Sequence, residues 1–503
     1  MTELIQHLSL GFSVALSLQN LMYCFIGCFL GTLIGVLPGI GPVATIAMLL
    51  PITFNLPPTP ALIMLAGIYY GASYGGSTTA ILVNLPGESS SVVTCIDGYQ
   101  MGRQGRAGPA LAIAALGSFF AGCVGTILIA LFGPPLAELA FEFGAAEYFS
   151  MMVLGLVSAV VLAHGSLIKA VCMILVGLLL GIVGTDVNSG IARYSFGISE
   201  LSDGIGFVSV AMGMFGFGEI ISNLEQGEER EVNTSKVGSL MPSWTDLKMS
   251  FGPIVRGTAL GTIFGILPGS HTVIASFSSY TLEKKLAKDP SRFGKGAIEG
   301  VAGPESANNA AAQTSFIPLL TLGIPTGAVM ALMVGAMTIQ GIAPGPQVMT
   351  QKPDLFWGMI ASMWVGNLML VILNLPLIGM WVQFLKIPYR VLFPGIILFC
   401  CIGAFSVNNS PAEVYLAGLF GFFGYFSSKW GCEPGPLLLG FVLGPLMEEN
   451  LRRAMLISRG DASVFFTRPI SCGMLIVAAA LLVIIVAPQV RKKRAEVVYE
   501  SAD

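Results

Sequence analysis

Proline or glycine interrupts long apolar stretches of this sequence at four places. Two places are Leu-Pro-Gly motifs, at 37–39 and 267–269, and two are segments rich in hydroxyl and amide side chains, at 70–88 and 305–327. Proline and paired glycines free backbone N–H and C=O groups from the hydrogen-bond ladder of a helix. Freed N–H groups at the start of a half-helix attract anions, whereas freed C=O groups with Ser, Thr and Asn oxygens suit Na⁺.

The candidate substrate- and ion-binding residues come from all four stretches: Pro38, Gly39, Gly75, Gly76, Ser77, Thr78, Thr79, Asn84, Pro86, Pro268, Gly269, Ser270, His271, Asn308, Asn309, Gln313, Thr314, Ser315, Thr321 and Pro325. His271 could bind a carboxylate or carry a proton, although a hydrogen bond to nearby backbone is an equally ordinary role. The alternative interpretation of the hydroxyls and amides is that they only hold neighbouring helices together. Na⁺ among these same residues is the one metal ion that the sequence suggests.

The elements that must position these residues are membrane helices. The chain has 503 residues, of which 54% are hydrophobic and 11% charged, and its mean hydropathy is +0.79. Residues 4–87 and 306–351 contain no Asp, Glu, Lys or Arg, and a water-soluble fold cannot bury so much apolar chain. Composition therefore excludes a soluble enzyme, a nucleic-acid-binding protein and a disordered scaffold. It predicts an all-α polytopic membrane protein, in contact with the lipid bilayer, with about 10–12 transmembrane helices plus two broken or re-entrant helical hairpins.

An internal repeat organises the chain. The sequence Gly31-Thr-Leu-Ile-Gly-Val-Leu-Pro-Gly39 reappears as Gly261-Thr-Ile-Phe-Gly-Ile-Leu-Pro-Gly269, with six of nine positions identical, and Leu85-Pro86 has a counterpart in Ile324-Pro325. We predict two membrane repeats, separated by a polar cytoplasmic linker and followed by a basic cytoplasmic tail. The predicted bounds are 1–224 for the first repeat (hairpin 20–54, signature segment 58–108), 225–250 for the linker, 251–490 for the second repeat (hairpin 251–282, signature segment 305–345) and 491–503 for the tail.

Basic residues in the loops indicate that the two repeats point in opposite directions across the membrane. The loop after the first hairpin, 53–60, has no basic residue, whereas the loop after the second hairpin has five, at 284–295. At the next loop the bias reverses, with Arg103 and Arg106 in the first repeat and only Lys352 in the second. Because basic loops stay in the cytoplasm, we predict inverted-topology repeats. Inverted repeats with broken helices are typical of secondary transporters.

Beyond residue 430, the number of expected membrane crossings is inconsistent with the cytoplasmic side assigned to the basic segments. Segment 433–447 cannot span the membrane if Arg452, Arg453 and the tail are all cytoplasmic, because segment 470–488 then crosses alone. Outside the hairpins and signature segments, the remaining helices are expected near 109–131, 145–164, 168–184, 205–222, 355–382, 391–407, 412–428, 433–447 and 470–488.

Motifs for enzymatic chemistry are missing. The chain has no GxxxxGK[ST] phosphate loop, so ATP does not drive it directly, and it has no HExxH motif or serine-nucleophile elbow. We therefore predict that the protein is not an enzyme, needs no organic cofactor, and is a secondary active transporter coupled to Na⁺ or H⁺. The alternative is an anion channel or another membrane protein without gradient coupling; an intramembrane enzyme is the less favoured one. A net charge of −3 gives no reason to expect a nucleic-acid partner.

The segment Tyr74–Glu88 (YGGSTTAILVNLPGE) carries the most specific pattern in the chain. With Asp97-Gly-Tyr99 and the other motifs it resembles the large membrane (permease) subunit of the tripartite tricarboxylate transporter family. The other motifs are Gly105–Gly108, Tyr280–Lys285, Phe293–Gly296, Glu305–Asn309 and Gly440–Gly444. The resemblance extends over essentially the whole chain.

The resemblance implies a multi-pass permease of the bacterial inner (cytoplasmic) membrane, driven by an ion gradient. It implies import of a carboxylate, either a tricarboxylate such as citrate or a dicarboxylate, in symport with Na⁺ or H⁺. It also implies two partners, a small membrane subunit and a periplasmic substrate-binding protein that delivers the carboxylate. The chain departs from the family pattern at Ser270-His271, where small glycine-rich residues are usual, and at Thr326-Gly327. Both departures fall in the expected site, so the resemblance does not single out citrate.

Overall fold

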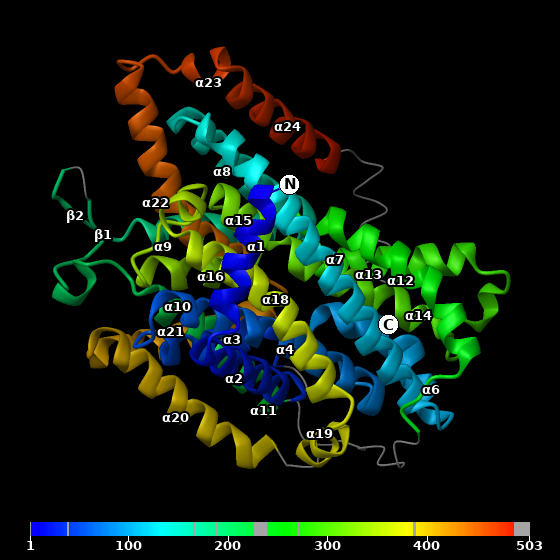
Figure 1. The fold of residues 1–503 in the computed structure, drawn as a ribbon. Coiled ribbons are helices and arrows are strands. Elements are labelled where there is room, and N and C mark those ends of the chain that lie inside the picture. The colour runs from blue at the N-terminus through cyan, green and yellow to red at the C-terminus, as the bar shows by residue number, and fades with distance from the viewer. Residues whose placement is uncertain are drawn as a thin grey trace.

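The computed structural model describes residues 2–37, 40–163, 166–186, 189–225, 239–269, 271–385 and 389–486. Nearly all the regular structure in these ranges is helical (Figure 1), and the sheet found among them is a two-stranded hairpin. Helices long and apolar enough to cross a membrane are Leu18–Gly35, Ala107–Phe141, Phe207–Glu225 and Pro353–Asn374, and further apolar helices are shorter. The prediction of an all-α polytopic membrane protein is confirmed.

The first half of the chain forms α1 (Thr2–Ala15), α2 (Leu18–Gly35), α3 (Pro42–Leu49), η1 (Leu50–Thr53), α4 (Pro58–Val83), η2 (Ser89–Ser91), α5 (Val92–Thr94), η3 (Cys95–Tyr99), α6 (Gln100–Arg103), α7 (Ala107–Phe141), α8 (Ala145–Leu162), α9 (Leu167–Gly181), β1 (Gly184–Thr185), β2 (Ala192–Arg193), η4 (Ser199–Leu201), α10 (Phe207–Ala211), η5 (Met212–Phe217) and α11 (Gly218–Glu225). The segments η3 and η5 are π-helical, and η1, η2 and η4 are 3₁₀ turns. The strands pair antiparallel, with Gly184 opposite Arg193.

The second half forms α12 (Trp244–Gly265), α13 (His271–Leu286), η6 (Pro290–Arg292), α14 (Glu299–Thr314), α15 (Phe316–Leu322), α16 (Ala328–Ile339), α17 (Gln347–Gln351), α18 (Pro353–Asn374), α19 (Ile378–Phe384), α20 (Tyr389–Asn408), α21 (Pro411–Lys429), α22 (Pro434–Ile457), α23 (Val464–Thr467) and α24 (Pro469–Val486). In the predicted linker, residues 226–238 lie outside the described ranges, and α12 already begins at Trp244. The predicted tail, 491–503, also lies outside them.

Each predicted hairpin is a pair of helices joined through its Leu-Pro-Gly motif. The first pair is α2 and α3, and the second is α12 and α13. The signature segments are long helices that end just before their prolines: α4 ends at Val83, and α14 with α15 ends at Leu322. The next residues, Asn84 and Gly323, both take the left-handed conformation that terminates a helix.

Glycines let α2 and α4 approach until their backbones touch, and α12 and α14 do the same. A Cβ atom added to Gly31 would overlap the carbonyl of Ile68, and one added to Gly261 would overlap the carbonyl of Ala307. The contact extends one turn in each direction, through Gly27 and Gly35 in the first pair and through Gly257 and Gly265 in the second. The two pairs therefore pack with the same register, in which Gly31 corresponds to Gly261. Close approach through small residues is a common basis of helix packing in lipid.

Helix α22 runs beside α9 and in the same direction. Its Leu437 carbonyl lies against Gly177 of α9, and its Phe441 carbonyl lies against Gly181, one turn further along both helices. Residues just before α22 lie at the start of α9, where Lys169 Nζ donates to the carbonyl oxygen of Trp430 over 2.5 Å. The far end of α22 lies beyond the end of α9. Helix α22 thus carries the chain from beside the start of α9, at Trp430, past the end of α9, towards Arg452.

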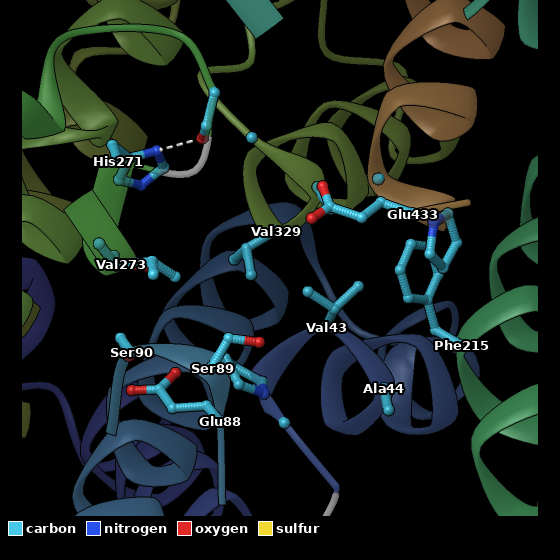
Figure 2. A pocket seen from close by; sticks show the side chains of 18 of the residues that line it. Val43, Ala44, Glu88, Ser89, Ser90, Phe215, His271, Val273, Val329 and Glu433 are labelled. Atoms are coloured by element: carbon cyan, nitrogen blue, oxygen red, sulfur yellow. Dashed lines mark hydrogen bonds between the residues drawn. The ribbon is translucent and has the colours of Figure 1, made fainter. Parts of the chain in front are cut away.

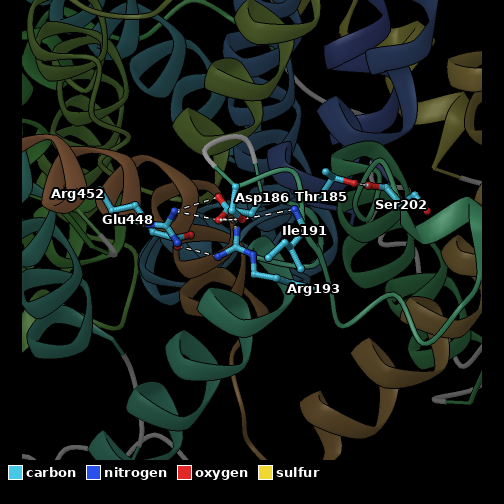
Figure 3. Close-up of polar contacts among 8 residues, drawn as sticks. Thr185, Asp186, Ile191, Arg193, Ser202, Glu448 and Arg452 are labelled. Carbon is cyan, nitrogen blue, oxygen red and sulfur yellow. Dashed lines mark hydrogen bonds and ion pairs between the residues drawn. The ribbon is translucent and has the colours of Figure 1, made fainter.

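An ion-pair cluster joins the far end of α22 to the β1–β2 hairpin (Figure 3). The Arg452 guanidinium lies 3.0 Å from Asp186 Oδ2 and 2.7 Å from Glu448 Oε1, and Arg193 also pairs with Glu448 at 2.7 Å. Helix α24 packs beside α8. Arg468, just before α24, lies 2.5 Å from Glu147, and Ser471 in its first turn lies 2.7 Å from Ser150. Figure 1 shows α22–α24, in orange and red, along one side of the bundle.

Asp97 ties the end of the first signature segment to a loop of the second repeat. Its Oδ1 accepts hydrogen bonds from the backbone N–H groups of Gly294, Gly296 and Ala297, at 2.7–2.9 Å. Its Oδ2 accepts a 2.9 Å hydrogen bond from the hydroxyl of Tyr280. Gly294 and Gly296 have φ values of 84° and 99°, which favour glycine. A single buried carboxylate thus links three of the motifs that carry the family resemblance.

Candidate functional site

A cavity of about 520 Å³ lies where the broken segments of both halves meet (Figure 2). Its wall includes the first residues of four helices, α3, α13, α16 and α22. The break after α4, at 86–90, forms a further part of the wall. Residues of α4, α5, α8, η5, α11 and α21 also line it. Segments of both sequence repeats therefore enclose one space.

Helix N-termini make this cavity favourable for an anion. The first N–H groups of a helix have no partner within the helix, and the aligned peptide dipoles place a partial positive charge there. Pro42 and Pro434 lack an N–H, so the donors of α3 and α22 come from the residues that follow. Among the described residues that line the cavity, none is Lys or Arg. An anion there would be held by backbone N–H groups and neutral side chains.

His271 occupies the first position of α13 on the cavity wall (Figure 2). Its Nδ1 lies 2.9 Å from the carbonyl oxygen of Gly269, while Nε2 has no hydrogen-bond partner in the described part of the chain. The N–H of Gly269 donates to the carbonyl of Thr326 over 2.6 Å, which ties this hairpin tip to the break before α16. The free ring nitrogen can donate to or accept from a ligand, depending on the tautomer.

Glu88 is an acidic residue of the same wall that the candidate set from the sequence does not include. It lies in the break after α4, next to Ser89 and Ser90 (Figure 2). Its Oε1 accepts a 2.7 Å hydrogen bond from Nδ2 of Asn308, so it connects the two signature segments. A signal was available in the sequence, since Glu88 is the first charged residue after Glu3. A carboxylate after so long an uncharged run is a candidate for function.

Two further carboxylates line the cavity from outside both signature segments. Glu219 lies in α11, directly after the π-helical segment η5, and Glu433 precedes the first residue of α22. π-Helical turns are frequent at functional sites. Segment 205–222 is expected from its sequence to be a membrane span, and the acidic residue Glu219 inside that span is the available signal for a functional role.

A second polar layer lies behind the wall, around Glu305 of α14. Glu305 is 1% exposed, its Oε2 accepts a 2.6 Å hydrogen bond from Ser77 of α4, and its Oε1 accepts one from the Thr94 hydroxyl. Asn309, one turn further along α14, donates to the Ser118 hydroxyl over 2.7 Å. Polar residues of both signature segments therefore contact one another inside the protein.

The structure distributes the candidate residues over several environments. Pro86, Gly269 and His271 line the cavity. Ser77, Asn308 and Asn309 belong to the polar contacts behind it, and Gln313 is buried there without a hydrogen-bond partner in the described ranges. The hydroxyls of Thr78, Ser315 and Thr321 donate to backbone carbonyls three or four residues earlier in the chain. Thr314 donates to the carbonyl of Ala310 in its own helix and also lies within hydrogen-bond distance of the Thr262 carbonyl of α12.

The remaining candidates shape the backbone. Gly75 packs against the end of α2, Gly76 against Gly87, and Thr79 donates to the carbonyl of Val36 over 2.8 Å. Asn84 is exposed and is not part of the cavity wall. Pro268 lies between α12 and α13, and Pro325 lies between α15 and α16; neither residue lines the cavity. Three candidates, Pro38, Gly39 and Ser270, lie outside the described residues.

Residues 71–75 have the spacing Gly-x-Ser-x-Gly, with Ser73 at the centre. It lies within α4, and its hydroxyl donates to the carbonyl of Tyr69 over 3.3 Å. A nucleophile elbow requires instead a sharp turn between a strand and a helix. The pattern therefore has no catalytic geometry here.

Comparison with known proteins adds independent information. Residues 21–439 match the tripartite tricarboxylate transporter TctA family. An uncharacterized 52.8 kDa protein in the TAR-I ttuC' 3' region of Agrobacterium vitis is 62% identical over 500 residues, which cover 99% of this chain and 100% of that protein. An uncharacterized protein in the TAR-II ttuC' 3' region of the same organism is 62% identical over 240 residues, 48% of this chain and 99% of that protein. No solved structure matches the chain. The family match covers most of the sequence, and the chain belongs to the tripartite tricarboxylate transporter TctA family.

Proposed function

We propose that this chain is the permease subunit of a tripartite secondary transporter that imports a carboxylate, using a gradient of Na⁺ or H⁺. The observation that carries the proposal is the cavity at which the N-termini of α3, α13, α16 and α22 converge. Each N-terminus offers N–H groups without partners in its own helix, and a carboxylate accepts several such bonds at once. The family to which the chain belongs supports the same class of substrate.

The absence of a basic residue from the described cavity wall suits transport rather than permanent binding. A dicarboxylate or tricarboxylate held by N–H groups, hydroxyls and His271 loses less interaction energy on release than one paired with a buried guanidinium, which would be left as an uncompensated charge. The three glutamates on the wall, Glu88, Glu219 and Glu433, place negative charge beside the anion. A cation that moves with the carboxylate would balance that charge, which is the physical basis of the proposed symport.

Alternating access is proposed to use the two repeats, in inverted topology, with the hairpins α2–α3 and α12–α13 at the cavity. The matched packing of Gly31 and Gly261 supports a common architecture of the repeats. We further propose an inner-membrane location with a cytoplasmic tail, and two partners, a small membrane subunit and a periplasmic binding protein. The family name, which describes a tripartite system, supports the partners.

Counterflow in proteoliposomes tests the proposal. The chain is reconstituted with the small membrane subunit, loaded with one of a panel of di- and tricarboxylates, and supplied with the radiolabelled compound outside, with and without the binding protein. A transporter accumulates label against its gradient, and an imposed Na⁺ or H⁺ gradient increases the accumulation. Simple equilibration would support an anion channel, and a chemically altered product would support an enzyme. Either result would refute the proposal.

A further inference from the structure

We infer that the loop formed by residues 193–204 is the surface on which a soluble substrate-binding protein docks. The identity of this partner rests on the proposed function, whereas the surface itself is a feature of the fold. We refer to residues 193–204 as the docking loop.

The docking loop exposes three large apolar side chains. Phe196 is 85% exposed, Tyr194 is 54% exposed and Ile198 is 48% exposed. Figure 1 shows that the β1–β2 hairpin and the segment after it project away from the helices, at the left of the view. Single apolar side chains are common on protein surfaces, but several together in a projecting segment are typical of a contact with another protein. Aromatic residues in particular are enriched in such contacts.

Contacts with strand β1 close the docking loop at its neck. The backbone N–H and the hydroxyl of Thr185 both donate to the carbonyl oxygen of Ser202 over 2.8 Å (Figure 3). Gly184 and Gly204 approach so closely that a Cβ atom on Gly184 would lie 2.7 Å from the backbone nitrogen of Gly204. The ion-pair cluster at α22 fixes the beginning of the loop. Loops whose ends are held together in this way are compact and frequently functional.

Two aromatic residues of the docking loop have a backbone conformation that is unusual for their type. The φ values are 53° for Tyr194 and 49° for Phe196. Positive φ is uncommon for residues other than glycine, and for bulky residues it is an outlier. Such conformations persist where the surrounding structure fixes them, and they cluster at binding and switch regions. The loop therefore presents its aromatic side chains in a fixed arrangement, which lowers the entropy cost of binding a partner.

The docking loop lies at the end of the bundle opposite the basic loop 284–295. Asp97 binds the backbone of that basic loop, and α7, which begins shortly after Asp97, is about 50 Å long and apolar enough to cross a membrane. Beyond α7 the chain enters α8, whose Ala146 packs with Ala454 of α22. In the same helix, Arg452 pairs with the β1–β2 hairpin. Because basic loops stay in the cytoplasm, the docking loop faces the periplasm in the proposed orientation.

The charge of the docking loop indicates the chemistry of its partner. Glu200 and Asp203 are exposed, and no ion pair within the described ranges includes either of them. Arg193, the basic residue of the loop, is already paired with Glu448. A matching partner has an apolar pocket for the aromatic side chains and basic residues at its rim. A symmetric contact between two copies of the chain would instead oppose like charges, which is unfavourable.

Helix α22 connects the docking loop to the carboxylate cavity. Pro434 and Leu439, near its start, line the cavity, and Glu448 and Arg452, further along, hold the β1–β2 hairpin. A protein bound to the loop therefore acts on an element that is joined directly to a helix of the cavity wall. We expect the docked protein to stimulate carboxylate uptake through this connection.

The test measures binding of the carboxylate-loaded binding protein of the same transport system to the full-length chain. The chain is reconstituted with the small membrane subunit in lipid nanodiscs, and binding is followed by biolayer interferometry. Phe196→Asn removes the aromatic side chain, and asparagine tolerates the left-handed backbone conformation. We expect the dissociation constant to increase about tenfold or more. Met241→Asn is the matched control, because Met241 is 82% exposed and lies at the opposite end, where Leu240 contacts Gly108 of α7.

Charge reversal and crosslinking test the same surface independently. Glu200→Lys combined with Asp203→Lys should slow association about tenfold at low salt and much less at high salt, because screening removes the attraction to a basic rim. The photoreactive residue p-benzoylphenylalanine, placed at Ile198 in intact cells, should crosslink to the same binding protein.

The inference is overturned if the wild-type chain does not bind the protein, if Phe196→Asn binds as tightly as the wild type, or if Met241→Asn loses binding equally. Crosslinking from Ile198 to the small membrane subunit, to a second copy or to lipid would also overturn it. Counterflow without the binding protein should be unchanged in Phe196→Asn, which shows that the variant is folded. If it does not fold, the double lysine variant and the crosslink decide the question. Failure of wild-type counterflow with intact binding would refute the proposed function and leave the docking surface standing.

Discussion

Asn84 and Gly323 end corresponding helices of the two halves in the same left-handed conformation, with φ values of 57° and 75°. Each residue directly precedes a Leu-Pro or Ile-Pro pair, so the chain leaves the helix and enters the break at the cavity. Glycine adopts this conformation without strain, and asparagine adopts it more readily than most other residues. The backbone requirement, rather than the amide chemistry, explains why these two residue types occupy the equivalent positions.

Asn84→Gly should therefore preserve both stability and transport, because the exposed amide is not part of the cavity wall. Asn84→Ala should lower the free energy of unfolding by about 1 kcal/mol, since alanine is strained in the left-handed region. Thermal unfolding and counterflow on the two variants check this. If Asn84→Gly folds normally but does not transport, the Asn84 amide is a ligand and the capping interpretation is wrong.

His271→Gly should change substrate preference more than folding. The substitution removes the free Nε2 atom from the cavity wall and widens the cavity beside Gly327. Loss of one hydrogen bond to a charged ligand should reduce affinity for the preferred carboxylate about tenfold or more. Competition by a panel of carboxylates in the counterflow assay measures the preference. His271→Gln, which keeps a polar side chain, is the control, and an unchanged preference in both variants would exclude a role for His271 in recognition.

Cysteines placed at Pro58 and Lys288 should react with an impermeant thiol reagent from opposite sides of the membrane. These positions follow the first and second hairpins, at the start of α4 and in the loop after α13. The native cysteines, nine in number, are first replaced to give an unreactive background. Labelling of both positions from the same side would mean that the repeats are parallel, and the proposed alternating-access mechanism would then lose its basis.

Asp97→Asn should destabilise the contact between the two halves. The Asp97 carboxylate accepts three backbone N–H bonds and one hydroxyl bond, and the amide of asparagine replaces one accepting oxygen with a donor. Hydrogen bonds to a charged group contribute about 1.5–3 kcal/mol each, so the unfolding midpoint should fall measurably. Asp203→Asn changes the same functional group at an exposed position and should leave the midpoint unchanged. Equal midpoints for both variants would show that Asp97 does not stabilise the 294–297 loop.

Arg452→Met should loosen the β1–β2 hairpin, because Arg452 bridges Asp186 of the hairpin and Glu448 of α22. We expect limited trypsin digestion at Arg193 to become about threefold faster, the size of effect that a partly exposed ion pair can produce. Arg453→Met is the matched control, since Arg453 pairs only with Glu449 of its own helix among the described residues. Equal cleavage rates in the two variants would mean that the cluster does not anchor the hairpin.

The sequence by itself determined the class of the fold and the segments that form the site. The uncharged stretches 4–87 and 306–351 require a membrane environment, because hydrophobicity is a local property of the chain. The Leu-Pro-Gly repeat located both hairpins, because proline and glycine interrupt helices in nearly any context. Boundaries were less certain: the predicted segment 109–131 is part of a helix that continues through Pro134 and Pro135 to Phe141.

Only the tertiary structure decided which residues of those segments face the cavity. Thr78 and Thr79 are neighbours in sequence and equally polar, but helical geometry and packing direct both hydroxyls to backbone carbonyls. Glu219 and Glu433 lie 214 residues apart in the chain, and no local pattern could bring them to the wall that also contains His271. The course of α22 beside α9 likewise depends on contacts of Gly177 and Gly181 with a distant helix. Long-range packing sets these relationships, because burial and hydrogen bonding are satisfied by the whole bundle rather than by each segment alone.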